Sequence, residues 1–208
     1  MNIPIVFEDD WLLVVNKPSG LLSVPTLKKE GRTLTSILNQ DAQGRNLKYR
    51  LYPCHRLDRE TSGLLIYAKG KNIEEKMVSA FRDRLVSKKY IAFVHGKLAQ
   101  PQGVINSAIE GKSALTKYRV LKESSNYSVV EVSPVTGRTN QIRIHFKYIQ
   151  HPLVGEDKFA YRKDFVLRFK RLCLEAQELS FKHPVTGKNL TVSIDLAAEL
   201  KDFLSKHD

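Results

Sequence analysis

The sequence predicts an α+β protein whose sheet is largely antiparallel. Short apolar or alternating runs, typical of strands, outnumber the segments with helical periodicity, and most neighbouring runs are separated by turns short enough for hairpins. The 208 residues, 42% of them hydrophobic and 27% charged, suffice for one sizeable core. We therefore expect a single domain spanning residues 1–208, with strands paired mainly to their neighbours in the chain.

The strands are predicted where apolar residues form short runs or alternate with polar ones. Acidic residues separate the first two runs, Pro and Gly end the second, and a polar tetrapeptide joins a later pair into a hairpin. The expected strands cover residues 3–7, 11–15, 64–69, 88–94, 116–122, 127–132, 172–181 and 189–194.

The helices are predicted from apolar residues three and four positions apart. Thr33 is expected to cap a short helix reaching residue 38, and Asn72 a longer one with acids in its first turn and arginines in its last. Two further helices are expected from Gln141 and over residues 196–204. Residues 41–52 show no periodicity and are expected to form a polar connector.

The formal net charge of +12 predicts attraction to a polyanion, with nucleic acid as the leading candidate. Charge alone does not distinguish RNA from DNA or from anionic lipid. The two cysteines, Cys54 and Cys173, make no disulfide framework and are expected to be reduced thiols. Without a basic leader or a span-length apolar segment, the protein is expected to be cytoplasmic.

One stretch, residues 55–63, combines a carboxylate with cations and leads directly into an apolar run: its sequence is HRLDRETSG. The neighbouring Arg56, Arg59 and His55 are expected to keep Asp58 ionised at neutral pH. An ionised, positioned aspartate acts as a nucleophile or a general base. A surface Arg–Asp pair is the structural alternative, and this stretch alone does not decide between them.

This stretch resembles the signature of the RluA-type family of RNA pseudouridine synthases, and five further segments are similar to family elements in the same order. They are NKPSGLL (16–22), KKYIAFVHG (88–96), GRTNQIRIH (137–145), HPLVGE (151–156) and HPVTG (183–187). A single short motif is weak evidence, but six in order across nearly the whole chain are specific.

The resemblance implies a central mixed sheet with peripheral helices and an active-site cleft across the middle. It also implies a catalytic domain alone, because the first strand begins too early for the S4 RNA-binding domain that many family members carry. The reaction detaches uracil from ribose C1′ and rejoins it through C5, so it requires no metal, redox partner or nucleotide cofactor.

The resemblance also implies roles for individual residues. Asp58 is the catalytic carboxylate, which either attacks C1′ or abstracts a sugar proton, and Arg143 is its ion-pair partner. Tyr90 stacks on the target uracil and has a hydroxyl available for proton transfer at C5. Arg56 enters the RNA helix in place of the flipped base, and Arg138 contacts phosphate or the active site.

Two positions depart from the family pattern: Asn140 and Glu175 each replace a usual histidine, and the second change could alter substrate contacts. The backbone-binding surface is expected to draw on further basic residues, among them Lys28, Lys29, Lys69, Lys71, Arg82, Arg84, Lys88 and Lys89.

The predicted function is therefore isomerisation of specific uridines in ribosomal RNA, transfer RNA or both, by a protein expected to be a monomer. The alternative is a non-catalytic RNA-binding protein or RNA chaperone that retains the fold. The complete set of Asp58, Tyr90 and Arg143 favours the enzyme. A DNA-binding function lacks a recognisable groove-reading motif.

Overall fold

The computed structural model describes residues 2–26, 32–160 and 167–207, which form two compact units. The first unit runs from the N-terminus to Ser87 and includes Glu178–Ile194. The second comprises Lys88–Gln177 and the chain from Asp195 onward. None of the helices in the described part of the chain is long and apolar enough to cross a membrane.

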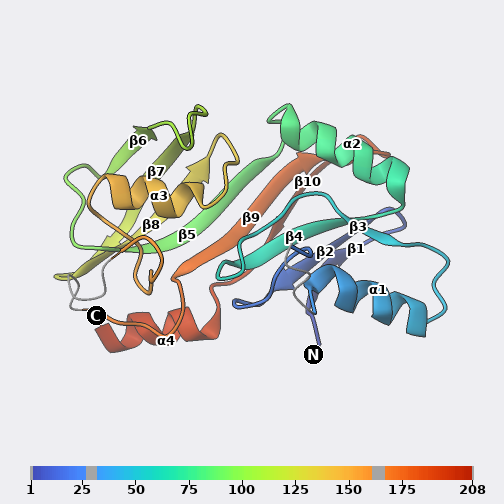
Figure 1. Ribbon diagram of the computed structural model, residues 1–208, viewed down its shortest axis with the longest axis horizontal. Coiled ribbons are helices and arrows are strands. Elements are labelled where there is room, and N and C mark those ends of the chain that lie inside the picture. Colours follow the sequence, from blue (N-terminus) through green and yellow to red (C-terminus); the bar gives the residue numbers. More distant parts are fainter. Residues whose placement is uncertain (1, 27–31, 161–166, 208) are drawn as a thin grey trace. The chain divides into compact units, whose positions relative to one another are not determined.

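The first unit is a sheet with two helices (Figure 1). The pairs β1–β2, β2–β4 and β3–β4 are antiparallel, and so is β9–β10. Its elements are β1 (Ile5–Glu8), β2 (Leu12–Lys17), α1 (Leu34–Gly44), β3 (Leu51–Pro53), β4 (Ser62–Lys69), α2 (Lys71–Arg82) and β10 (Asn189–Ser193). Strand β9 (Leu174–Lys182) contributes Glu178–Lys182 to this unit and its earlier residues to the second unit.

Helix α2 covers one face of this sheet. Val14 and Ile66 are opposite each other on β2 and β4, and they join one apolar cluster with Ile73 and Met77 of α2. On the other face, the Tyr67 hydroxyl lies 3.0 Å from Thr35 Oγ1 of α1. Both central strands are therefore buried on both sides, which explains their uninterrupted apolar runs.

Three local predictions in this unit were wrong. Residues 41–52, expected to form a polar connector, include the end of α1 and the start of β3. Helix α2 begins at Lys71 after Gly70, whose φ of +115° turns the chain out of β4, so Asn72 is not the cap. Helix α1 continues to Gly44, beyond the predicted end, because Asn39 exchanges two 2.9 Å hydrogen bonds with the backbone of Leu51. The cap at Thr33 is confirmed, with a reciprocal bond to Ser36.

The HPVTG segment folds into the turn between β9 and β10. The Nδ1 atom of His183 accepts the backbone N–H groups of Val185 at 3.2 Å and Thr186 at 3.0 Å, so the proton of the neutral ring belongs to Nε2. Nε2 approaches Asp9 Oδ2 at 3.0 Å without the alignment of a hydrogen bond. This motif therefore builds a turn within the first unit.

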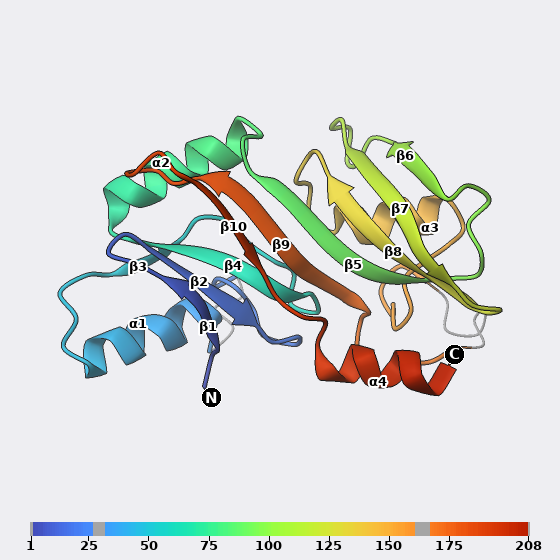
Figure 2. The ribbon, with the colours of Figure 1, turned by 180° about the vertical axis from the view of Figure 1, so that it is seen from behind.

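The second unit contains an antiparallel sheet in the order β5-β8-β7-β6 and two helices (Figures 1 and 2). The edge strand β6 was not predicted. Its elements are β5 (Ser87–His95), β6 (Gln102–Asn106), β7 (Leu115–Glu123), β8 (Tyr127–Pro134), α3 (Gln141–Tyr148) and α4 (Ala198–His207). The predicted α+β class with a largely antiparallel sheet is confirmed.

The two helices of this unit pack on opposite faces of its sheet. Phe93 of β5 joins a cluster with Leu200 and Phe203 of α4. On the other face, Tyr118 of β7 meets the ring of Phe146 of α3 edge-on, with centroids 5.7 Å apart. Figures 1 and 2, taken from opposite sides, show α3 in front of β7 and β8 in one view and behind them in the other.

Candidate active site

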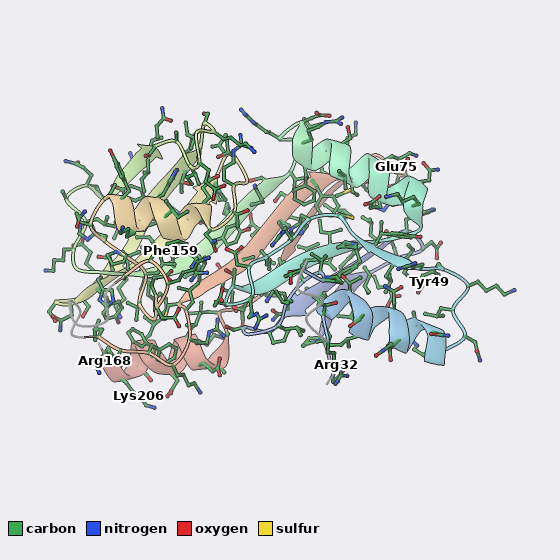
Figure 3. The ribbon with its side chains drawn as sticks, in the orientation of Figure 1. Arg32, Tyr49, Glu75, Phe159, Arg168 and Lys206 are labelled. Carbon is green, nitrogen blue, oxygen red and sulfur yellow. The ribbon has the colours of Figure 1, made fainter. Side chains whose placement is uncertain are left out.

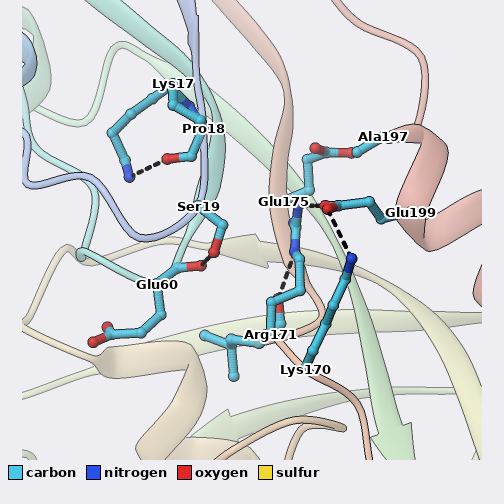
Figure 4. Close-up of polar contacts among 10 residues, drawn as sticks. Lys17, Pro18, Ser19, Glu60, Lys170, Arg171, Glu175, Ala197 and Glu199 are labelled. Carbon is cyan, nitrogen blue, oxygen red and sulfur yellow. Dashed lines mark hydrogen bonds and ion pairs between the residues drawn. The ribbon is translucent and has the colours of Figure 1, made fainter. Parts of the chain in front are cut away.

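The loop that carries Asp58 is held by Lys17, whose side chain is completely buried. Its ammonium donates to the carbonyl oxygens of Pro18 at 2.9 Å (Figure 4), Leu21 at 2.7 Å and Arg59 at 3.1 Å. Three acceptors match the three protons of an ammonium group, so this buried charge is well hydrogen-bonded. The NKP segment and the HRLDRE loop therefore meet through Lys17.

Further bonds from residues 19–23 reach the same loop. Ser19 Oγ donates to Glu60 O at 2.7 Å (Figure 4), and the N–H of Gly20 to Arg59 O at 2.8 Å. Ser23 Oγ donates to Leu57 O at 2.8 Å and accepts the Leu57 N–H at 3.1 Å. Every one of these contacts uses the main chain of the loop, so none of them consumes its charged side chains.

The side chains of the loop are placed differently from one another. Arg56 is exposed and Asp58 is half-buried. The Nε2 atom of His55 accepts the backbone N–H of Ile66 at 3.1 Å, and its ring packs tilted against that of Phe81 with centroids 4.5 Å apart. The influence of His55 on the ionisation of Asp58 stays a prediction.

In the second unit, Tyr90 lies on the sheet face that α3 covers. Tyr90 and Tyr118 are both directly opposite Val132, one from each side, and directly paired residues share a face. Tyr118 in turn contacts Phe146 of α3. Tyr90, which is buried at 9% exposure, and Arg143 of α3 are therefore brought to the same face of one sheet.

Arg143 is buried, which excludes an exposed position on its helix. Its Nε and Nη2 each donate at 2.7 Å to one oxygen of Glu156, with side-chain exposures of 2% and 0%. Nη1 donates to Asn140 Oδ1 at 3.1 Å. The ring of Phe159, labelled beside α3 in Figure 3, lies 5.1 Å from the guanidinium carbon.

Glu156 is itself tied to the chain that follows it. Its Oε1 accepts the backbone N–H groups of Lys158 at 2.9 Å and Phe159 at 3.3 Å. Burial raises the pKa of Glu156. The hydrogen bonds and charge of Arg143, together with these N–H groups, lower it by more, so the pKa of Glu156 lies below its usual value. Glu156 is therefore an anion at neutral pH.

The turn that carries Arg138 is shaped by Gln141. Gln141 Oε1 accepts the N–H of Arg138 at 2.9 Å and the hydroxyl of Thr136 at 2.7 Å. The Arg138 side chain is exposed and donates from Nε to Ser113 O at 3.1 Å. Lys88 Nζ approaches Thr136 O at 3.4 Å, and burial lowers the pKa of Lys88. Two cations thus flank this turn.

Both departures from the family pattern have a structural account. Asn140 adopts φ +54°, a left-handed conformation in which asparagine and histidine are both enriched among non-glycine residues, and its oxygen binds Arg143. Glu175 is buried and accepts the N–H of Ala197 at 2.8 Å, where α4 begins (Figure 4). An anion at a helix N-terminus is stabilised by the exposed N–H groups.

Two cations predicted to bind RNA, Lys28 and Lys29, lie outside the described residues. Within residues 2–26, 32–160 and 167–207, no group of three or more His, Cys, Asp or Glu side chains is placed to hold a metal ion. Cys54 and Cys173 are free and buried, and burial raises the pKa of Cys54 to about 12 and that of Cys173 further.

Comparison with known proteins places these residues in a family. The RNA pseudouridylate synthase family matches residues 11–148. The chain belongs to this family. The dual-specificity RNA pseudouridine synthase RluA of Vibrio cholerae is 35% identical over 99% of this chain and 88% of its own length. Ribosomal large subunit pseudouridine synthase C of the same organism is 33% identical over 97% and 68%.

A solved structure agrees with this family. The human RNA pseudouridylate synthase domain containing 4 superposes with a TM-score of 0.81 at 25% identity, covering 98% of this chain and 92% of its own. The chain therefore has the pseudouridine synthase fold and is an isomerase of that class. The predicted central cleft and the pairing of Arg143 with Asp58 stay predictions, because Asp58 and Arg56 belong to the first unit and Tyr90, Arg138 and Arg143 to the second.

Sequence reasoning missed two residues that hold the candidate site, Lys17 and Glu156. Both lie in segments that resemble family elements, and those elements were the available signal. Each also has a distant partner that no local rule would detect: Lys17 bonds to a carbonyl 42 positions away and Glu156 to a guanidinium 13 positions away.

Proposed function

We propose that this pseudouridine synthase converts specific uridines of ribosomal RNA, transfer RNA or both. Its support is the pair of relatives described above, one named as a dual-specificity enzyme and the other as a ribosomal large subunit enzyme. The net charge of +12 suits a polyanionic substrate. Enzymes that act on a base in structured RNA flip it out of the stack, and recognise shape around it.

Asp58 is the carboxylate that attacks C1′ or abstracts a sugar proton. The observation that carries this assignment is the anchoring of its loop, because Lys17, Ser19 and Ser23 all bind main-chain atoms of that loop. Such anchoring fixes the position of the loop without using the Asp58 carboxylate in these bonds. Preorganised positioning of a reacting group removes a large part of an activation barrier.

The other roles follow the same proposal. Tyr90 stacks on the target uracil and its hydroxyl serves proton transfer at C5. Arg143 holds the reacting carboxylate in its ionised form. Arg56, exposed at the start of the Asp58 loop, replaces the flipped base in the RNA stack, and Arg138 contacts a phosphate. Extrusion of the base costs a few kcal/mol, which stacking and charge on the vacated site partly offset.

The enzyme is proposed to act in the cytoplasm as a monomer and without a nucleotide cofactor. Buried thiols at Cys54 and Cys173 suit a reducing compartment. The chemistry moves one base on one ribose, and every bond that breaks is replaced within the same nucleotide. It therefore consumes no oxidant, reductant or activated phosphate.

Tritium release from RNA labelled at C5 of uridine tests this proposal, because the new carbon–carbon bond expels that hydrogen. Total RNA is taken from cells that lack this protein, and wild type is compared with Asp58→Asn. Release by the wild type alone is the expected result. No release by either protein, with RNA binding intact, would favour the non-catalytic RNA-binding alternative and overturn the proposal.

A further inference from the structure

We propose that Glu156 is a positioning residue for the reaction, acting through Arg143. This inference rests on the proposed function, because it presupposes that Arg143 serves the chemistry. The observation behind it is the two-pronged contact at 2.7 Å and 2.7 Å between one carboxylate and one guanidinium, both fully enclosed by protein.

A gain in the stability of the folded protein does not explain the presence of such a buried ion pair. Removing two charges from water costs about as much as their attraction returns, so a buried ion pair adds little over an apolar pair of the same volume. Its distinctive effect is geometric. A carboxylate that engages Nε and Nη2 together fixes the plane and rotation of the guanidinium.

The fixed plane matters for every donor of Arg143. Glu156 binds two of its N–H groups and Asn140 binds one. Because the guanidinium is rigid and planar, the directions of all its N–H bonds follow from its contact with Glu156. Glu156 therefore decides where Arg143 can donate.

Glu156 is held on its far side as well. The backbone N–H groups of Lys158 and Phe159 bind the same oxygen that receives Nη2, and the ring of Phe159 lies 5.1 Å from the guanidinium carbon. The carboxylate cannot rotate without losing these bonds. Arg143 is thus oriented by a rigid support, on the sheet face that carries Tyr90.

The charge of the pair leads to the same role. With Glu156 ionised and in direct contact, the positive charge of Arg143 is already balanced within the protein. Arg143 then contributes to the reaction as an aimed hydrogen-bond donor more than as a cation that attracts RNA. Loss of Glu156 should therefore change the rate of the chemical step and leave RNA binding nearly unchanged.

The test compares Glu156→Gln, Glu156→Asp and Arg143→Met, together with the double variant Arg143→Met/Glu156→Gln. Each is assayed by tritium release from C5-labelled RNA, with kcat and KM measured well below its melting temperature. Glu199→Gln is the matched control, since Glu199 pairs with Arg171 at 3.0 Å and is half-exposed.

Glu156→Gln is expected to lower kcat by roughly 10- to 100-fold, because a misaimed group costs that much, with KM for RNA changed less than about threefold. Glu156→Asp, which keeps the charge, should recover part of kcat, and Glu199→Gln should behave as wild type. In the Arg143→Met background, adding Glu156→Gln should cost nothing further. The neutral double variant also avoids an unpaired buried charge.

Three results would overturn the inference. The first is a folded Glu156→Gln variant with wild-type kcat. The second is a Glu156→Gln substitution that lowers kcat by the same factor in the wild-type and Arg143→Met backgrounds. The third is wild-type kcat in Arg143→Met. The first two leave the proposed function intact. The last removes Arg143 from the chemistry, and a wild type that releases no tritium at all would instead mean that the proposed function itself has failed.

Discussion

The loop around Asp58 and the surroundings of Arg143 are both rigidly held, but by opposite means. Lys17, Ser19 and Ser23 grip the main chain of the Asp58 loop, and none of those bonds touches the Asp58 side chain. Arg143, in contrast, is held through its own guanidinium, which donates two hydrogen bonds to Glu156. The anchoring bonds of the first region therefore use atoms other than the carboxylate proposed to react, whereas the bonds that hold Arg143 use the same guanidinium that is proposed to serve the reaction.

The largest expected effect tests the separation in the first region. Asp58→Asn should reduce tritium release by at least about 10³-fold, since a reacting carboxylate is lost. Its free energy of unfolding should change by less than about 1 kcal/mol, because the loop is anchored elsewhere. Urea unfolding and the tritium assay measure the two quantities. Asp41→Asn, at an exposed position on α1, is the control for both.

A second prediction concerns the anchor itself. Lys17→Met should lower the free energy of unfolding by about 2–4 kcal/mol, because three carbonyls lose a buried, charged donor. Tritium release should fall with the displaced loop. Lys48→Met, at an exposed position, should stay within about 0.5 kcal/mol of wild type. Wild-type stability in Lys17→Met would contradict the claim that Lys17 anchors the Asp58 loop.

In the second region, the pairing of Glu156 with Arg143 predicts that the free energy of unfolding depends on pH. The pKa of Glu156 is lower in the folded protein than its usual value of 4.5, so the unfolded chain binds more protons in the window between the two. The contribution of this group to stability is complete above that usual value and is lost as pH falls through the folded pKa. Urea unfolding between about pH 7 and pH 3.5 should show a steeper acid loss for wild type than for Glu156→Gln. Equal slopes would contradict the pairing.

The smallest effect concerns the exposed cations near each region. Arg56→Gln and Arg138→Gln should each reduce the slope of log K against log salt by about 1, as expected for one lost phosphate contact. Filter binding of RNA over a series of salt concentrations measures the slope. Substitution of the buried Arg143 should leave it unchanged, and a reduced slope there would show that Arg143 contacts phosphate after all.

Local structure was predictable where neighbours in the chain decide it. The cap at Thr33 and the hairpin of β7 and β8 depend on residues a few positions apart, and both were found. The end of α1 was missed because the hydrogen bonds of Asn39 to Leu51 come from another element. The edge strand β6 was missed because three of its five residues are polar or glycine and most of it is exposed.

The amino-acid sequence by itself determined the class of fold, the family and the identity of the candidate residues, because ordered motifs and periodicity are properties of the chain. Only the tertiary structure decided how those residues are held: Lys17 on a carbonyl of the Asp58 loop, and Arg143 on Glu156. Buried charges must find partners wherever the fold brings acceptors together, and that proximity is set by packing between elements distant in sequence.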